Sequence, residues 1–254
     1  MTLRRPYTYC TLLFLAIMGI TLVIKGISSW LIVWAVVYLI LLVLGASKIQ
    51  WNFFTQSLHK GNHKNWVALT FDDGPAAATE KILDFLRAHQ VPATFFSIGA
   101  RAAQHPELVK RWDSEGHLVG NHSYHHGFHF DWQSAQRMQQ ELQQTNEQIA
   151  AIIGKTPKLF RPPYGITNPN LAKAIARSGM HSIGWSIRSY DTTAKTSEQL
   201  LARILNKMQG GDIILLHDSM EITARILPEL ITAIRNKGYE IVRLDKLLDI
   251  PPYE

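Results

Sequence analysis

The chain begins with two long apolar segments and continues with short apolar runs that alternate with amphipathic stretches. Residues 7–24 and 26–47 form uncharged runs of 18 and 22 residues, separated by Lys25. A membrane-spanning helix needs about 20 mostly apolar residues. The pattern therefore predicts two transmembrane helices, at about 7–24 and 27–46. The join contains Gly26 and two serines, which favours a helical hairpin over residues 1–48.

The basic residues around this segment predict its orientation. Arg4 and Arg5 precede the first run, Lys48 and further lysines follow the second, and only Lys25 lies between them. Under the positive-inside rule this favours a multi-pass protein of a bacterial-type inner membrane with its C-terminal body in the cytoplasm. An external body is the alternative. A signal peptide followed by one anchor helix is a further alternative, although no convincing small-residue cleavage site follows the first run.

After a juxtamembrane linker at 49–64, residues 65–250 show a regular alternation of elements. Amphipathic helical stretches separate the apolar, β-prone runs, and the Gln-rich stretch at 133–148 is interpreted as a solvated helix face. Strand–helix alternation predicts an α/β fold, with parallel strands covered by helices in an open sheet or a closed barrel. The seven predicted strands are 66–71, 94–98, 117–120, 159–160, 181–186, 212–216 and 240–244, and the predicted helices are 79–89, 106–115, 132–153, 170–178, 197–208 and 222–237.

Charge and cysteine content exclude some functions for this body. The net charge is +6, but residues 49–254 contain only 22 basic against 20 acidic groups. This near balance argues against a nucleic-acid partner, which needs a clustered basic face. The single cysteine, Cys10, excludes an intramolecular disulfide and a cysteine-based zinc cluster.

Polar residues gather directly after the predicted strands. In a parallel α/β fold the carboxyl ends of the strands meet on one face, where sites form. We therefore expect these clusters to converge. They are Asp72-Asp73, His122 to His126, Arg161 to Gly165, Arg188 with Asp191, and His217-Asp218.

Two of these clusters suggest a metal site. Adjacent carboxylates such as Asp72 and Asp73 repel unless a cation or hydrogen bonds compensate, although Asp-Gly-Pro is also ordinary turn chemistry. His122 and His126 are four residues apart, a spacing that would place both on one face of a helical turn. Two imidazoles and one carboxylate make a three-ligand site with open positions, typical of a catalytic metal.

The remaining clusters suggest acid–base chemistry beside such a metal. The spare carboxylate suits a general base, and His217, with a reference pKa of ~6.5, suits a general acid. Arg161 before two prolines is a rigid segment that could hold its guanidinium against a carboxylate and present a backbone N–H to an oxyanion. A satisfied core histidine and a surface arginine are the plainer alternatives.

The ordered motifs at 70–74, 122–126, 161–165 and 215–217 resemble those of the NodB-homology polysaccharide deacetylases, carbohydrate esterase family 4. The resemblance covers about residues 65–250 and implies a distorted (β/α) barrel of about seven strands. It implies that Asp72 is the catalytic base, that His217 is the general acid, and that a divalent metal ion, most commonly zinc, is the cofactor. The further residues that it implies are the metal ligands Asp73, His122 and His126, Arg161 to orient Asp72, Asp191 to tune His217, and Tyr164, Pro163, Leu215 and Trp185 beside the substrate.

One motif departs from the family pattern, which usually has an acidic residue where this chain has Arg188. Arg188 would either suit a phosphate-bearing or otherwise anionic substrate or form a structural pair with a neighbouring acid.

Together the residues and the resemblance predict a metal-dependent hydrolase. It would remove an N-acetyl or other small acyl group from an amino sugar in a glycan or a lipid-linked saccharide. The expected partners are this carbohydrate and the membrane. The alternatives are an O-acetyl esterase acting on a polysaccharide and a catalytically inactive, membrane-tethered glycan-binding protein.

Overall fold

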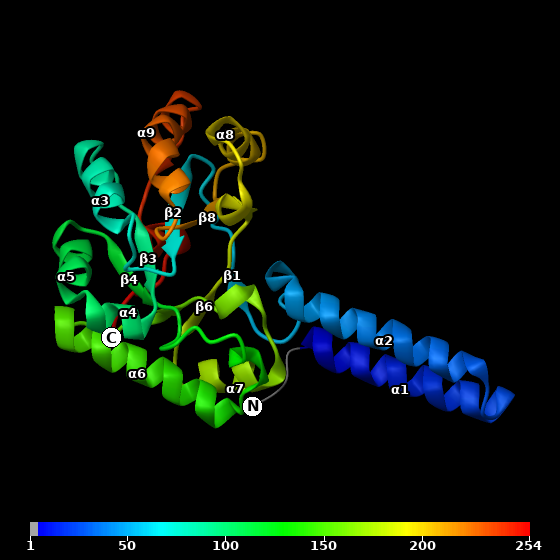
Figure 1. Cartoon of the computed structure of the whole chain (residues 1–254). Helices are drawn as coiled ribbons and strands as arrows, with labels where there is room; N and C mark the ends of the chain where they lie inside the picture. Colours follow the sequence, from blue (N-terminus) through cyan, green and yellow to red (C-terminus); the bar gives the residue numbers. More distant parts are fainter. Residues whose placement is uncertain (1–4) are drawn as a thin grey trace.

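The computed structural model describes residues 5–254 and shows a helical hairpin that projects from a rounded α/β body (Figure 1). The hairpin consists of α1 (Arg5–Lys25) and α2 (Ser29–Ser47), which lie side by side. The rings of Phe14 and Tyr38 stack between them at 4.2 Å. Both helices are long and apolar enough to cross a membrane, as the two runs predicted. Arg4 lies outside the described residues.

The body is built on one curled sheet whose strand pairs are all parallel. The strand order is β1-β6-β5-β4-β3-β2-β8-β7, and β9 pairs with β2. Because β1 and β7 stand at opposite ends of this order, the barrel is open, which confirms the predicted distorted (β/α) barrel. The strands are β1 (Ser57–Leu58), β2 (Trp66–Asp72), β3 (Thr94–Ser97), β4 (Leu118–Asn121), β5 (Leu159–Phe160), β6 (His181–Ile183), β7 (Ile187–Arg188), β8 (Ile213–His217) and β9 (Glu240–Ile241).

Helices cover the outer face of this sheet (Figure 1). Each predicted helix is present within a few residues, and two short helices, α4 and α10, were not predicted, because they are too short to show an amphipathic period. The helices are α3 (Thr79–Ala88), α4 (Gly99–Gln104), α5 (Pro106–Ser114), α6 (Ala135–Ile153), α7 (Pro169–Arg177), α8 (Ser197–Leu205), α9 (Glu221–Asn236) and α10 (Leu244–Leu248).

The structure differs from the prediction in three segments. The strand expected at 240–244 ends at Ile241, and α10 begins at Leu244. The strand expected at 181–186 ends at Ile183, and a separate strand, β7, pairs with β8 instead. The segment 49–64, expected as a linker, packs with the body: Ile49 is 2% exposed, and β1 pairs with β6. Two residues of strand are too few to show a period of two, so the sequence pattern did not reveal β1.

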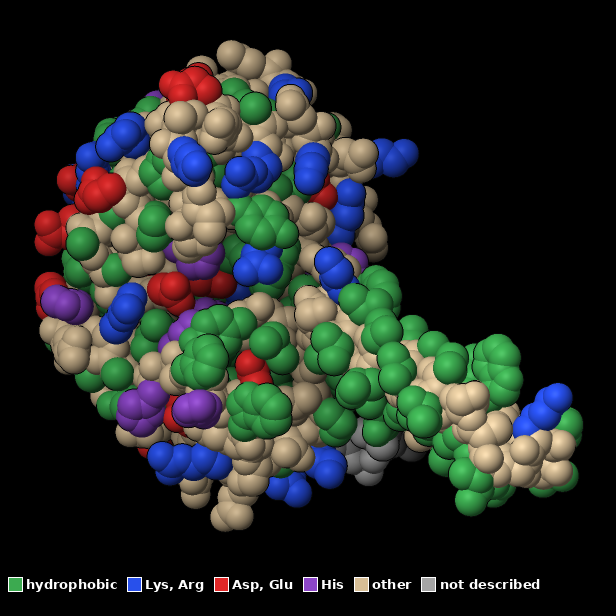
Figure 2. Space-filling view, turned by 45° about the vertical axis from the view of Figure 1, so that its right-hand side comes forward, with side chains coloured by type: hydrophobic (Ala, Val, Ile, Leu, Met, Phe, Trp, Pro, Cys, Tyr) green, Lys and Arg blue, Asp and Glu red, His purple; other side chains and the backbone are tan. Residues whose placement is uncertain are grey.

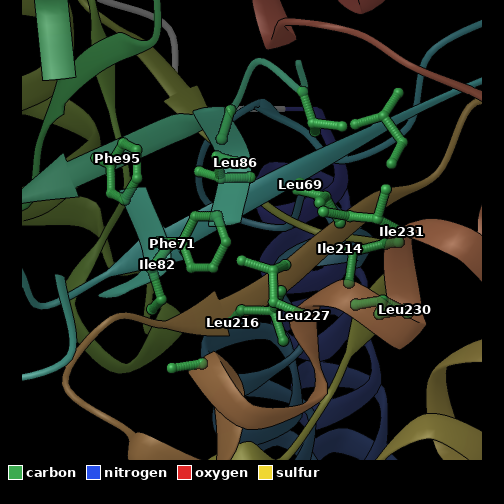
Figure 3. Packing of buried hydrophobic residues seen from close by; sticks show 14 of the residues in the cluster. Leu69, Phe71, Ile82, Leu86, Phe95, Ile214, Leu216, Leu227, Leu230 and Ile231 are labelled. Carbon is green, nitrogen blue, oxygen red and sulfur yellow. The ribbon is translucent and has the colours of Figure 1, made fainter. Parts of the chain in front are cut away.

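Alternation along the central strands separates the core from the site. Successive side chains of a strand point to opposite faces. In β2, Leu69 and Phe71 belong to the large apolar cluster between sheet and helices, where the Phe71 and Phe95 rings stack at 5.1 Å (Figure 3). In β8, Ile214 and Leu216 also belong to this large apolar cluster. The intervening residues therefore face the interior of the curled sheet.

Candidate active site

The two central strands bring Asp72 and His217 together. The register pairs Thr70 with Leu215 and Asp72 with His217 at the carboxyl ends of β2 and β8. Because paired residues of parallel neighbours point to the same face, these side chains share the interior face. The sequence expectation that strand ends converge is met at this edge of the sheet.

A buried ion pair fixes Asp72. Nη1 of Arg161 donates to Oδ1 of Asp72 at 2.7 Å and to Oγ1 of Thr70 at 2.8 Å, while its Nη2 donates to the Gly184 carbonyl at 3.0 Å. The guanidinium is fully buried and lies 4.2 Å from the centre of the Phe96 ring. Burial lowers the pKa of Arg161, and the Asp72 carboxylate opposes that shift. Removing either partner would leave an uncompensated buried charge.

Asp73, His122 and His126 form a cluster beside this pair, with one ligand atom of each lying within 4.8 Å of the others. Nε2 of His122 and Nε2 of His126 each lie 3.6 Å from Oδ1 of Asp73. Nδ1 of His122 faces the Arg161 carbonyl at 2.7 Å, so it holds the proton and leaves the Nε2 lone pair directed at the cluster. This donor set fits a divalent cation such as zinc.

The histidine segment is not helical, which corrects the expectation of a shared helical face. The chain leaves β4 at Asn121, and Ser123 and His126 adopt left-handed φ values of 63° and 51°. The two imidazole rings still meet, with their centres 4.7 Å apart. The two rings are therefore brought together by an irregular loop and not by the periodicity of a helix.

Glu141 of α6 holds this loop in place. Its Oε2 accepts from the backbone N–H groups of Tyr124 and His125, each at 3.0 Å. Glu141 is 5% exposed, so it does not belong to the solvated face assigned to the Gln-rich helix. Sequence reasoning missed it. A signal was present, since Glu141 lies one turn from the buried Met138 and Thr145, on the inner side of the helix.

His217 and the buried Asp191 form a second pair. Nδ1 of His217 lies 2.7 Å from Oδ1 of Asp191, and Oδ2 of the same carboxylate accepts from the Thr223 hydroxyl at 2.7 Å. Burial alone would lower the pKa of His217, but the hydrogen bond and charge of Asp191 outweigh it and raise that pKa to about 9. Thr223 was not predicted, because in the sequence of α9 it cannot be distinguished from the other buried, inward-facing positions.

The loop after β5 faces the metal-competent cluster. Tyr164 has a φ of 56°, in the left-handed region, and its ring centre lies 4.7 Å from that of His126. Pro163 and Gly165 on either side of Tyr164 are buried. Trp185, 5% exposed, packs so closely on Gly165 that an added Cβ would overlap its ring. Among residues 5–254, five of the eight non-glycines with positive φ lie in the loops of this site: Asp73, Ser123, His126, Tyr164 and Tyr190.

Arg188 does not form the structural ion pair that was one of its two interpretations. Within residues 5–254 no carboxylate lies within ion-pair distance of it. Its guanidinium instead lies 5.6 Å from the centre of the Trp185 ring and 5.0 Å from that of Tyr190.

Asp218, the neighbour of His217, lies beneath the Asp72-Asp73 turn. It is fully buried, and its Oδ2 accepts from the Thr79 hydroxyl at 2.6 Å. Burial raises its pKa to about 7. An added Cβ on Gly74 would overlap the Asp218 carboxyl, which explains the glycine at that turn. Figure 2 shows acidic and histidine side chains gathered in a hollow of the rounded body, away from the apolar hairpin.

Comparison with known proteins places the chain in a family. Residues 59–183 match the family profile described as polysaccharide deacetylase. The chain is 34% identical over 203 residues to a peptidoglycan-N-acetylglucosamine deacetylase of Bacillus cereus, covering 76% of this chain and 74% of that protein. It is 33% identical over 198 residues to the peptidoglycan-N-acetylmuramic acid deacetylase PdaA of Bacillus subtilis, covering 76% and 75%. Against the peptidoglycan-N-acetylglucosamine deacetylase PgdA of Listeria monocytogenes it is 37% identical over 182 residues, but this chain spans only 38% of that relative's length.

Solved structures give the same result. A crystal structure of a peptidoglycan N-acetylglucosamine deacetylase superposes with a TM-score of 0.74 at 31% identity, covering 77% of this chain and 94% of that one. A family 4 carbohydrate esterase from Streptomyces lividans, in complex with acetate, superposes with a TM-score of 0.66 at 35% identity, covering 70% and 92%. Fold and site thus define a hydrolase built on a distorted (β/α) barrel. The chain belongs to the polysaccharide deacetylase family, carbohydrate esterase family 4, as its motifs indicated.

Proposed function

We propose that this protein hydrolyses the acetamido group of an N-acetylated amino sugar in a glycan or lipid-linked saccharide, releasing acetate and a free amine. The observation that supports this most strongly is the convergence of three ligand atoms from Asp73, His122 and His126 within 4.8 Å, flanked by the carboxylate of Asp72 and the imidazole of His217. The names of the relatives, peptidoglycan deacetylases, support the substrate class.

In this proposal Asp73, His122 and His126 hold a divalent ion, and their nitrogen and oxygen donors suit zinc. When bound, such an ion polarises the acyl carbonyl and lowers the pKa of water. The chain's own contribution is the orientation of the ligands. The Arg161 carbonyl fixes the tautomer of His122, and Glu141 holds the loop between the two histidines.

Asp72 acts as the general base. Its Oδ1 is held by Arg161, while its Oδ2 lies 3.8 Å from Nε2 of His122 and so faces the cluster. The guanidinium keeps Asp72 oriented. The carboxylate takes a proton from the attacking water as the water oxygen bonds to the carbonyl carbon.

His217 acts as the general acid. Asp191 holds Nδ1, so the protonated ring presents Nε2–H to the substrate nitrogen. The C–N bond breaks as this proton moves to the leaving amine. The backbone N–H of Tyr164, placed by its left-handed conformation, donates to the developing oxyanion. Pro163, Leu215 and Trp185 enclose the acyl group.

The hairpin of residues 1–48 acts as a membrane anchor for the deacetylase domain at 65–250. The spanning windows of α1 and α2 are 0% and 6% buried within the structure, so their apolar surfaces need another partner, and a bilayer supplies one. We infer a cytoplasmic body from the flanking charges. A reporter fused after Glu254 that works on one side of the membrane tests this. A cytoplasmic signal directs the substrate search to lipid-linked sugars, and an external signal overturns the orientation and points to a wall polymer.

The test of the activity is acetate release from N-acetylglucosamine oligomers by the full-length protein in detergent. We expect release to stop after dialysis against a chelator and to return on addition of Zn²⁺. Undiminished release from the metal-free protein would contradict the proposed mechanism. An O-acetylated xylan assayed in parallel distinguishes the amidase from an esterase, which would release acetate from the xylan alone.

A further inference from the structure

We infer that Arg188 forms an anion-binding subsite at the rim of the active site, and that the natural substrate contains a phosphate or carboxylate near its acetamido group. This inference rests on the proposed deacetylase function and specifies its substrate class. The name of one relative, a peptidoglycan-N-acetylmuramic acid deacetylase, refers to an acidic sugar, but no name assigns the residue that would bind the acid, and the family pattern places an acidic residue at this position.

The position of Arg188 follows from strand register. Arg188 pairs with Leu215 across β7 and β8, two residues before His217 on the neighbouring strand. Paired residues in parallel strands point to the same face. Leu215 belongs to the apolar cluster inside the curled sheet, whereas Ile187, the preceding residue in β7, packs into the cluster on the outer face. Arg188 is therefore directed toward the interior face, on the side of the general acid.

Two aromatic rings hold the guanidinium there. The rings of Trp185 and Tyr190 lie within cation–π distance of it, at 5.6 Å and 5.0 Å. Trp185 is itself immobilised against Gly165, and Nη1 of Arg203 donates to the Tyr190 carbonyl at 3.1 Å. The Arg188 side chain is thus positioned by packing alone.

Its hydrogen-bonding capacity is unused. Within residues 5–254 no acceptor takes a guanidinium N–H of Arg188, in contrast to Arg161, whose buried guanidinium donates to three acceptors. Arg188 is exposed. A guanidinium presents its N–H groups in a planar fork that matches phosphate or carboxylate oxygens. A neutral sugar hydroxyl would use this fork poorly, because it offers neither a charge nor two acceptor oxygens.

Two sources of that anion exist for an N-acetylated amino sugar. One is the diphosphate that joins a saccharide to a lipid carrier, and the other is a carboxylate attached to the sugar ring, as in N-acetylmuramic acid. The experiment uses a neutral N-acetylglucosamine oligomer, an N-acetylglucosamine diphosphate ester and an N-acetylmuramic acid oligomer. Each is assayed with the full-length zinc-loaded protein, its Arg188→Gln and Arg188→Lys variants, and Arg225→Gln, an exposed arginine of α9, as the matched control.

We expect Arg188→Gln to lower kcat/KM for one of the two anionic substrates about ten- to hundredfold, mainly through KM, in line with a hydrogen bond to a charged group. The neutral substrate should change less than twofold, Arg188→Lys should restore part of the loss, and Arg225→Gln should leave every substrate unchanged. The anionic substrate that responds identifies the source.

An equal loss on all three substrates, or no loss on any, would overturn the subsite. Calorimetric binding of the same three compounds gives a readout that does not depend on turnover. Weaker binding of an anionic sugar to Arg188→Gln supports the subsite even for a protein that releases no acetate. Absent acetate release with intact discrimination would therefore count against the proposed function and not against Arg188.

Discussion

The site contains two imidazole–carboxylate groups built from the same residue types, with opposite electrostatics. At His217, Nδ1 lies 2.7 Å from Asp191, and the pKa is raised to about 9. At His126, Nε2 lies 3.6 Å from Asp73, and burial, followed by the neighbouring charge of His122, lowers the pKa. One imidazole is kept as the cation, and the other is kept neutral with a free lone pair.

Distance and neighbours explain this difference. A carboxylate that accepts a direct hydrogen bond stabilises the imidazolium, whereas a second imidazole across a gap destabilises it. A proton donor and a metal ligand need these opposite states. The role of each histidine here is therefore set by whether a carboxylate accepts a direct hydrogen bond from it.

The largest effect is expected from removing a member of the cluster. His126→Ala leaves two donors, too few for a catalytic zinc site. We expect the purified full-length protein to lose stoichiometric zinc by elemental analysis and acetate release to fall to background. His89→Ala, at the C-terminal end of α3 and outside the cluster, serves as the control and should change neither. Retained zinc with full activity would remove His126 from the ligand set.

Asp72→Asn separates the base from the ligands. It keeps the shape but removes the charge, so we expect kcat to fall about 10²–10⁴-fold while zinc content stays near one per chain. Asp84→Asn, on the exposed side of α3, is the matched control. The variant also leaves the buried Arg161 charge uncompensated, and a thermal melt measures that cost separately. Full turnover by Asp72→Asn would refute the assigned base.

Asp191→Asn tests the other half of the comparison. His217 must be protonated to act as an acid, so activity should fall as pH rises through about 9 in the unsubstituted protein. Without the carboxylate this alkaline limb should move toward ~6.5, the ordinary histidine value. The control is Asp212→Asn, an equally buried aspartate just before the opposite end of β8, which should leave the pH profile in place. An unmoved limb in Asp191→Asn would assign it to another group.

The smallest effect is expected at Thr223, which touches the pair only through Asp191. Thr223→Val removes one hydrogen bond to a charged acceptor, and we expect about 1.5–3 kcal/mol lower stability. The alkaline limb of the pH–rate profile should move to slightly higher pH, because a less stabilised carboxylate attracts the His217 proton more strongly. Thr232→Val, an exposed threonine of the same helix, should do neither. Chemical denaturation and a pH–rate profile give the two readouts, and a limb that moved as far as in Asp191→Asn would contradict the secondary role of Thr223.

The features that depend on strand periodicity were predicted best from the sequence. The alternation in β2 and β8 and the polar residues after each strand end placed Asp72 and His217 together, as the register shows. Features that depend on irregular backbone were predicted less well. The contact between His122 and His126 depends on left-handed residues in a loop. The four-residue spacing predicted the correct pair of histidines, but it predicted a helical conformation that the loop does not have.

Supporting groups were the hardest to predict. Glu141 lies in a helix whose glutamines suggested a solvent-exposed face. Its role depends on contact with the loop that follows β4, which is distant in the sequence. Arg188 was left with two interpretations because pairing partners of a surface arginine are not encoded locally. The fold excludes the structural ion pair, since among residues 5–254 it places two rings and no acid beside Arg188.

The junction between α2 and the body has a consequence for how substrate is encountered. Thr167, beside the Arg161 loop, donates its backbone N–H to the Ala46 carbonyl in the last turn of α2 at 3.0 Å, and Nε2 of Gln50 donates to the Trp185 carbonyl at 2.9 Å. With the hairpin in a bilayer, these hydrogen bonds hold the domain directly against the end of α2, so that no flexible linker lets the domain move relative to the membrane. The enzyme would then sample a thin layer at fixed height, and its rate would follow the surface density of substrate rather than the bulk concentration.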